Sequence, residues 1–181
     1  SFTVQETCQP VSGYPWNIIG NLVCDSTGDV DVSSLNVTSG ASLTLRNIRL
    51  TVGDTVIEPG GSLAIFNSKR TIWQNGNLTI SGIYTLTNST LRMNGTTDGS
   101  IGINVTSTGS MIINQSSNIT NGQDLNFNYF FIVNNGSTFK MKDSYLSYAG
   151  WAGTNGQRGL EINTTVTEFY NNTLNSNYMS L

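Results

Sequence analysis

The 181-residue chain has no histidine, two cysteines, three prolines and few charged residues. Lys and Arg total 8, Asp and Glu total 11, and the formal net charge is -3. This composition argues against a nucleic-acid-binding surface, which needs clustered basic side chains. Without histidine there is no imidazole-based triad, and two cysteines do not make a zinc-binding pattern. We therefore expect no nucleic-acid partner and no metal or other cofactor.

Two hydrophobic patterns are also missing. No apolar run approaches the roughly 18 residues of a membrane-spanning helix, and no segment repeats apolar residues at the spacing of an amphipathic helix. The chain instead holds 23 Asn, 21 Ser and 23 Thr. Neutral hydrogen-bonding groups are therefore expected to cover most of the surface, and we expect no membrane span in this chain.

A phrase of the form apolar-x-apolar-x-polar recurs six times, usually after Gly-Ser or another small pair. The copies occupy 43–47, 63–67, 84–88, 111–115, 139–143 and 167–171, so their last residues lie 20, 21, 27, 28 and 28 positions apart. Repeats of this length indicate stacked structural units. Each step therefore predicts one coil of a solenoid.

The apolar residues within each copy lie two apart, which is the period of a β-strand, and further short alternating runs lie between the copies. We expect two or three strands per coil, each pairing with its counterpart about 4.8 Å away in the next coil. Equivalent residues should then stack in two apolar inner columns: Leu43, Leu63, Tyr84, Met111, Phe139 and Thr167 in one, and Leu45, Ile65, Leu86, Ile113, Met141 and Phe169 in the other.

These repeats resemble the right-handed parallel β-helix (pectin-lyase-like) proteins of cell surfaces, which include carbohydrate-associated members. The resemblance implies an all-β, right-handed parallel β-helix of about six coils over residues 29–181, preceded by an N-terminal strand and cap over residues 1–28. The charge-poor composition is similar to that of archaeal surface proteins.

Both cysteines precede the first repeat. Cys8 and Cys24 enclose a short loop, and we interpret them as a disulfide that staples the cap. Closing a loop of about 15 residues contributes roughly 3 kcal/mol in the chain-entropy description. The alternative is a pair of free buried thiols in a cytosolic chain.

Asn-x-Ser/Thr sequons occur ten times, although a chain this rich in Asn, Ser and Thr contains several by chance. Together with the disulfide and the scarcity of charge, they favour a secreted, N-glycosylated cell-surface protein. The sequon asparagines are Asn36, Asn77, Asn88, Asn94, Asn104, Asn114, Asn118, Asn135, Asn163 and Asn171.

A polar residue ends each copy of the phrase, where the strand should turn. Asn tolerates the left-handed backbone of such corners, and stacked amides can hydrogen-bond along the axis. We expect a turn ladder here, and ligand-binding amides are the alternative. A residue locked into an internal ladder could not carry a glycan, which makes the two sequon members a test. The ladder residues are Asn47, Asn67, Asn88, Gln115, Asp143 and Asn171.

Lys140 aligns with Glu168 one coil later, so these side chains should form a cross-strand ion pair on the outer face. In the alternative interpretation they line a groove that binds or cleaves acidic polysaccharide. The carboxylates are dispersed along the chain, so we expect no enzyme, with a polysaccharide lyase or glycoside hydrolase as the alternative. The groove would also include Lys142, Asp143, Arg158 and Glu161.

Two further clusters have more than one interpretation. Asp25, Asp29 and Asp31 could bind Ca²⁺ through oxygen ligands or form a solvated turn, and they lack the spacing of an EF-hand. The aromatic residues over 127–131 and at Tyr145, Tyr148 and Trp151 exceed what one inward strand face can bury. Some of these rings should point outward, as a sugar-stacking platform, an apolar patch under the loop 149–159, or a subunit contact.

The sequence therefore favours a structural or adhesive extracellular protein without enzymatic activity. Residues 177–181 are still repeat-like, so we expect either that the chain is cut from a longer protein or that a neighbour completes its last coil. The alternating segment 1–7 could add as a strand to the open end of the next subunit. We expect self-association through the solenoid ends or the N-terminal strand, in a filament or surface layer. The alternative is a carbohydrate-binding or polysaccharide-cleaving β-helix module.

Overall fold

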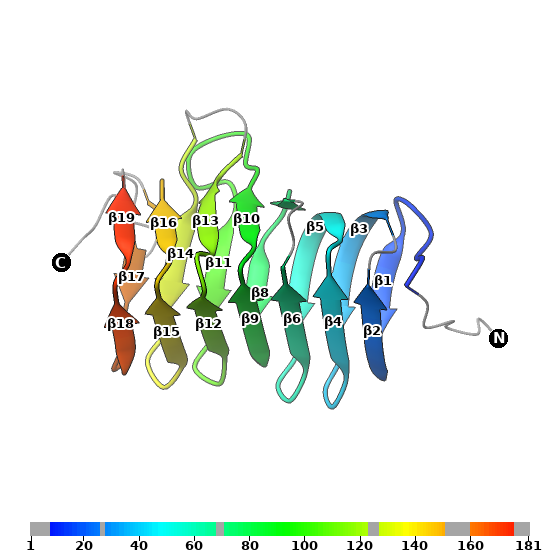
Figure 1. The fold of residues 1–181 in the computed structure, drawn as a ribbon, viewed down its shortest axis with the longest axis horizontal. Coiled ribbons are helices and arrows are strands. Elements are labelled where there is room, and N and C mark those ends of the chain that lie inside the picture. Colours follow the sequence, from blue (N-terminus) through cyan, green and yellow to red (C-terminus); the bar gives the residue numbers. More distant parts are fainter. Residues whose placement is uncertain (1–7, 26–27, 68–70, 123–126, 151–159, 176–181) are drawn as a thin grey trace.

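The computed structural model describes residues 8–25, 28–67, 71–122, 127–150 and 160–175. In these residues it contains nineteen β-strands, whose coils follow one another along a single axis from the N-terminal to the C-terminal end (Figure 1). The part of the chain that the structure describes contains no helix capable of spanning a membrane.

The strands belong to two sheets, and every strand pairing is parallel. The seven-stranded sheet consists of β2 (Asn21–Asp25), β4 (Ser42–Arg46), β6 (Ser62–Phe66), β9 (Ile83–Thr87), β12 (Ser110–Asn114), β15 (Thr138–Lys142) and β18 (Glu168–Tyr170). The twelve-stranded sheet consists of β1 (Pro15–Ile18), β3 (Asp29–Val37), β5 (Arg49–Ile57), β7 (Ile72–Gln74), β8 (Leu78–Ile80), β10 (Thr90–Met93), β11 (Gly102–Val105), β13 (Asn118–Asn121), β14 (Phe130–Val133), β16 (Tyr145–Ser147), β17 (Leu160–Ile162) and β19 (Thr173–Asn175).

In each coil the chain passes from one sheet to the other, with one strand in the seven-stranded sheet and one or two strands in the twelve-stranded sheet, and each strand pairs with strands of the neighbouring coils. This arrangement is a parallel β-solenoid, which confirms the all-β coiled fold expected from the repeats. The seven-stranded sheet begins at β2, so residues within the expected cap already pair with the first repeat.

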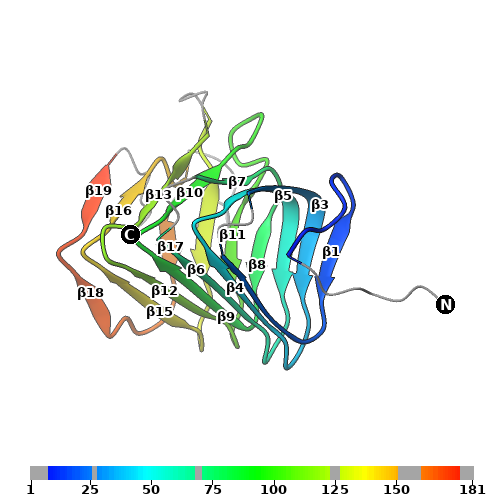
Figure 2. The same cartoon turned by 45° about the vertical axis from the view of Figure 1, so that its right-hand side comes forward.

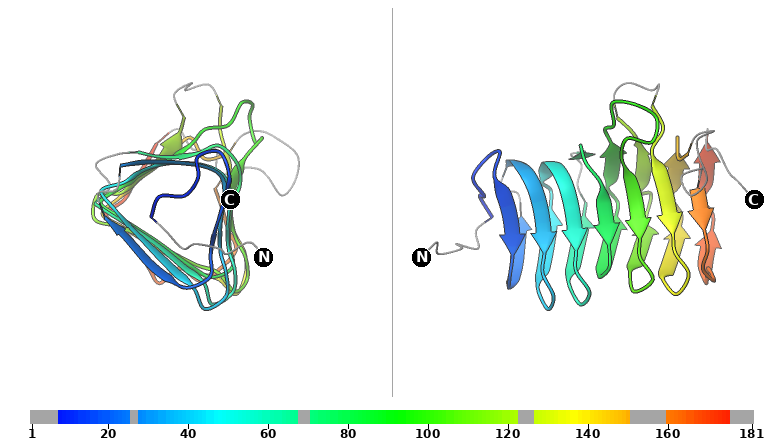
Figure 3. Two further views of the ribbon diagram at one scale, coloured as in Figure 1. Left: turned by 90° about the vertical axis from the view of Figure 1, so that its right-hand side faces the viewer. Right: turned by 180° about the vertical axis from the view of Figure 1, so that it is seen from behind.

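Viewed along its axis, the solenoid is a triangle (Figure 3). The seven-stranded sheet forms one side, and the twelve-stranded sheet covers two sides because its long strands β3 and β5 curve around a corner (Figure 2). At that corner Gly53 lies against Ser33 of the preceding coil, where a Cβ would be 2.0 Å from the Ser33 carbonyl oxygen. β5 then pairs with both β7 and β8. We name the side with β7, β10, β13, β16 and β19 the first face, and the side with β8, β11, β14 and β17 the second face.

The corner between the first and second faces lengthens along the chain. It comprises residues 75–77 in one coil and residues 94–101 in the next. The growth from three to eight residues accounts for most of the increase in repeat length between the second and third steps. We name these segments the growing corner.

The strand register confirms the predicted inner columns through the fifth copy of the phrase, whereas their last members, Thr167 and Phe169, are exposed. Leu43 pairs with Leu63, which pairs with Tyr84, and the column continues through Met111 to Phe139. These side chains are all buried, and burying each large apolar side chain contributes roughly 1.5 to 3 kcal/mol. The columns therefore form one continuous core along the axis.

The predicted disulfide is also confirmed. Cys8 and Cys24 are bonded with their Cα atoms 5.4 Å apart. Between them, β1 pairs with β3 and places Trp16 and Ile18 in the core. Residues that precede the first repeat therefore cover the first coil.

Candidate functional site

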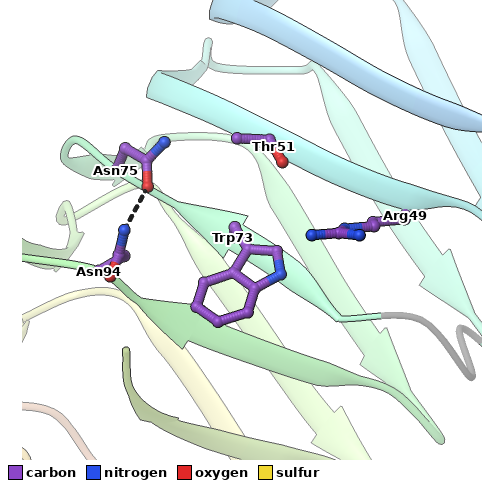
Figure 4. Close-up of a pocket in the computed structure, with 5 residues that line it drawn as sticks. All are labelled: Arg49, Thr51, Trp73, Asn75 and Asn94. Carbon is purple, nitrogen blue, oxygen red and sulfur yellow. Dashed lines mark hydrogen bonds between the residues drawn. The ribbon is translucent and has the colours of Figure 1, made fainter. Parts of the chain in front are cut away.

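A shallow depression of about 240 Å³ lies on the outer surface of the first face and reaches the growing corner (Figure 4). Five residues from three successive coils line it: Arg49, Thr51, Trp73, Asn75 and Asn94.

The aromatic wall of the depression follows from strand alternation. Ile72 and Gln74 of β7 are buried, so Trp73 between them points outward. In the parallel register Trp73 lies between Thr51 of the preceding coil and Arg92 of the next. The Arg92 guanidinium carbon lies 5.5 Å from the centroid of the indole ring, within the range of a cation–π contact. Thr51 is much smaller than the indole, so the depression opens on that flank of Trp73.

The polar groups of the depression come from both of its ends. At the growing corner the Asn94 Nδ2 donates to the Asn75 Oδ1 at 2.9 Å. At the other end Arg49 is 3.9 Å from the Asp29 carboxylate, with both side chains about half exposed. An exposed pair at this distance contributes little to stability. An indole flanked by amides, a hydroxyl and a guanidinium suits a pyranose, whose C–H face is apolar and whose rim carries hydroxyls.

Comparison of the chain with protein-family models, curated proteins and solved structures finds no match.

Sequence reasoning did not identify Trp73. The available signal was its position as the outward residue of the alternating run 72–74. Which neighbours would surround it depended on the pairing between coils, which is not visible in the run itself.

The six turn-ladder residues all adopt left-handed backbone conformations, with φ between 47° and 59°. All six are exposed, at the corner between the seven-stranded sheet and the first face. Among the described residues, side-chain hydrogen bonds join Asn88 to Asn67 at 3.1 Å and Asn171 to Asp143 at 2.8 Å. The ladder thus lies on the surface, and its two sequon members are accessible to solvent.

None of the ten sequon asparagines is buried. Asn77, Asn88, Asn135, Asn163 and Asn171 are exposed, and Asn36, Asn94, Asn104, Asn114 and Asn118 are half-buried. In contrast, Asn121 is only 1% exposed, and it begins no sequon.

Lys140 and Glu168 occupy paired positions on β15 and β18 and form an ion pair. The hydrogen bond from Lys140, its charge and the charge of Lys142 hold the pKa of Glu168 below its usual value. Glu161 lies on β17 in the other sheet and accepts a hydrogen bond from Asn163 at 2.8 Å. The structure therefore does not bring Glu161 together with Glu168, and Arg158 lies outside the described residues.

The other acidic residues of the predicted clusters have separate surroundings. Asp143 accepts the ladder bond from Asn171, and Asp29 lies near Arg49. Asp25 accepts a hydrogen bond from the Asn47 amide at 3.5 Å. Over the described ranges, no three His, Cys, Asp or Glu side chains converge on a position that could hold a metal ion.

The aromatic run divides between core and surface. Tyr129 and Phe131 are buried, and burial raises the pKa of Tyr129. Phe130 lies over Gly102 of the preceding coil, where a Cβ would be 2.3 Å from the ring. Tyr145 is exposed, and Trp151 lies outside the described residues. The outward rings thus come from separate positions on the first and second faces.

Proposed function

We propose that this chain is a secreted, N-glycosylated structural or adhesive protein of a cell surface. The observation that carries the proposal is the position of the sequons: all ten asparagines lie outside the core, whereas the buried Asn121 has no sequon. Glycans attached at these positions would surround the solenoid without disturbing its inner columns.

The disulfide and the composition support the same compartment. A disulfide persists in oxidising environments such as the cell exterior and is rare in reducing compartments, and Cys8 and Cys24 are bonded. Only 10% of the residues are charged. A surface of neutral polar groups has few carboxylates to protonate, so its interactions change little with external pH.

Self-association through the ends of the solenoid is part of this proposal. In the last described coil Phe169 is 39% exposed, although its counterpart Met141 in the preceding coil is fully buried. A strand from a second copy that paired with β18 would cover the exposed ring. The segments 1–7 and 177–181, which the sequence suggests for this role, lie outside the described residues.

Native protein provides the test. Glycopeptide mass spectrometry should find glycans on several sequons, with the exposed turn residue Asn135 among them, and electron microscopy should show a fibre or lattice. Native material that carries no glycan on any sequon and stays a monodisperse monomer at micromolar concentrations would overturn the proposal.

The second candidate function is a carbohydrate-binding module, and the Trp73 depression is the observation that favours it. In that case soluble oligosaccharides should change the tryptophan fluorescence of the chain, and Trp73→Ala should abolish the change. No response to a panel of neutral and acidic oligosaccharides would contradict this candidate.

A further inference from the structure

Asn94 lines the Trp73 depression, and it also begins the sequon Asn94-Gly95-Thr96. No other sequon asparagine is among the five lining residues. Asn94 directly follows β10, where the chain leaves the first face and enters the growing corner, and Thr96 is exposed. The sequon is therefore in a surface turn that a glycosyl-transferring enzyme can reach.

The amide of Asn94 is held in place by the preceding coil. Its backbone N–H donates to the Gln74 carbonyl at 2.8 Å, and its Nδ2 donates to the Asn75 Oδ1 at 2.9 Å. A glycosylated asparagine keeps one N–H on Nδ2, so this side-chain bond can persist while the sugar replaces the other hydrogen. The first sugar would thus start from a fixed position at the end of the depression.

The distance from this position to Trp73 is short. Asn75 lies beside Asn94 and two residues beyond Trp73 on the same chain segment. Two residues of strand span about 7 Å, and neighbouring strands are about 4.8 Å apart. The first two sugars of a glycan on Asn94 can therefore reach the indole.

The depression offers this glycan complementary groups along its length. The open flank of Trp73 can stack on the C–H face of a pyranose. The Thr51 hydroxyl and the Arg49 guanidinium lie beyond the indole and can bond to sugar hydroxyls (Figure 4). On the other side of the ring, Arg92 holds the indole in position.

We infer that the Trp73 depression seats the chain's own N-linked glycan, attached at Asn94, rather than a soluble sugar. The inference rests on the proposed glycosylation. A sugar tethered at Asn94 has an effective concentration in the millimolar range at Trp73, which favours it over weakly bound free sugars. The seated glycan would join the successive coils that contain Thr51, Trp73 and Asn94, at the point where the corner lengthens.

The test compares glycosylated chains secreted from a host that modifies sequons. Thr96→Ala removes the sequon but leaves Asn94 and its bond to Asn75 in place. Asn135→Gln removes a glycan from an exposed turn away from Trp73 and serves as the matched control. Glycopeptide mass spectrometry first establishes the occupancy of Asn94 in the parent chain.

Two measurements then show whether the Asn94 glycan occupies the Trp73 depression. Sugar C–H protons should give nuclear Overhauser effects to the Trp73 indole protons in the parent and in Asn135→Gln, but not in Thr96→Ala. Thr96→Ala should lower the unfolding midpoint by about 2–4 °C when Trp73 is present, the shift for roughly 1 kcal/mol in a domain of this size. In the Trp73→Ala background the same substitution should have no further effect.

The outcomes separate this inference from the proposed function. An occupied Asn94 without sugar–indole contacts, or with additive midpoint shifts, overturns the inference and leaves the glycoprotein proposal intact. The same holds if Asn94 is unmodified while other sequons carry glycans. Free sugar that binds at Trp73 in the glycosylated parent also overturns it, because the seat would then be empty. Absence of glycans from every sequon of native protein overturns both this inference and the proposal that the chain is N-glycosylated, and the oligomeric state then tests the structural role by itself.

Discussion

The first coil and the last described coil are both built from parallel strands with inward apolar side chains, yet these side chains differ in their exposure to solvent. At the N-terminal end Trp16, Ile18 and Cys24 are buried, and the disulfide and β1 cover the coil. At the other end Phe169 continues an apolar column but is 39% exposed. In a solenoid each coil contacts only its neighbours, so the burial of a residue depends on whether a coil or cap lies on both sides of it. The repeat supplies the column, and non-repeat residues close its first end.

The largest difference in stability should be found between the alanine variants of two phenylalanines in adjacent coils. Phe139→Ala removes a fully buried ring that packs edge-on against Phe131 at 5.6 Å. We expect it to lower the free energy of unfolding by about 3–5 kcal/mol. Phe169→Ala should cost about 1 kcal/mol, because its ring already contacts solvent. Urea unfolding of monomeric protein measures both, and equal losses would show that Phe169 is covered in solution.

Removal of the disulfide should cause the next largest loss of stability. Replacing Cys8 and Cys24 together by Ser opens a loop whose ends are 16 positions apart, and we expect a loss of about 3 kcal/mol. The same urea titration, with and without reductant, provides the measurement. Reductant should destabilise the parent and leave the double variant unchanged. If the parent were insensitive to reductant, the disulfide would not be what closes the first coil.

Substitutions in the turn ladder should change the free energy of unfolding less, and by a similar amount in every coil. Asn67 has φ 48°, so Asn67→Ala should cost about 1 kcal/mol through the left-handed backbone. Asn67→Gly should cost less, because glycine accepts that φ and only the bond with Asn88 is lost. Gln115→Asn should raise the thermal unfolding midpoint slightly, since Asn suits a φ of 54° better than Gln. A larger loss for Gly than for Ala would contradict the backbone explanation.

The smallest effect should be the pH dependence of the last described coil. The hydrogen bond and charge of Lys140, with the charge of Lys142, lower the pKa of Glu168 in the folded state. The stability contributed by this carboxylate is therefore present above its unfolded-state pKa and is lost as the pH falls through the lower folded-state value. Unfolding midpoints across this acid range should fall less in Glu168→Gln than in the parent. Lys140→Met should remove the same difference, and a parent and a Glu168→Gln variant with identical pH profiles would contradict the prediction.

The sequence predicted the core and the corners because both depend on local rules. Alternation at period two assigned Leu43 and Leu45 to the inside, and the recurrence of the phrase gave the strand partners of each. The polar residue that ends each phrase was expected at a corner because Asn accepts a left-handed backbone, and all six adopt one. The Lys140–Glu168 pair followed from the same alignment.

The Trp73 depression could not be predicted in this way, because the sequence separation between paired residues of neighbouring coils changes within one coil. Leu45 pairs with Ile65, 20 positions on, but Leu50 pairs with Ile72 and Thr55 with Leu78, at offsets of 22 and 23. The neighbours of Trp73 therefore cannot be read from the repeated phrase.

The sequence by itself determined that the chain coils, which side chains form the apolar columns, and where the backbone turns. These features depend on side-chain alternation and on backbone preferences within a few residues. Only the tertiary structure decided that Thr51, Trp73 and Asn94 share one depression and that Phe169 is exposed. Neighbours on the outer surface depend on the lengths of all the corners in a coil, and burial at the end of a column depends on what covers it.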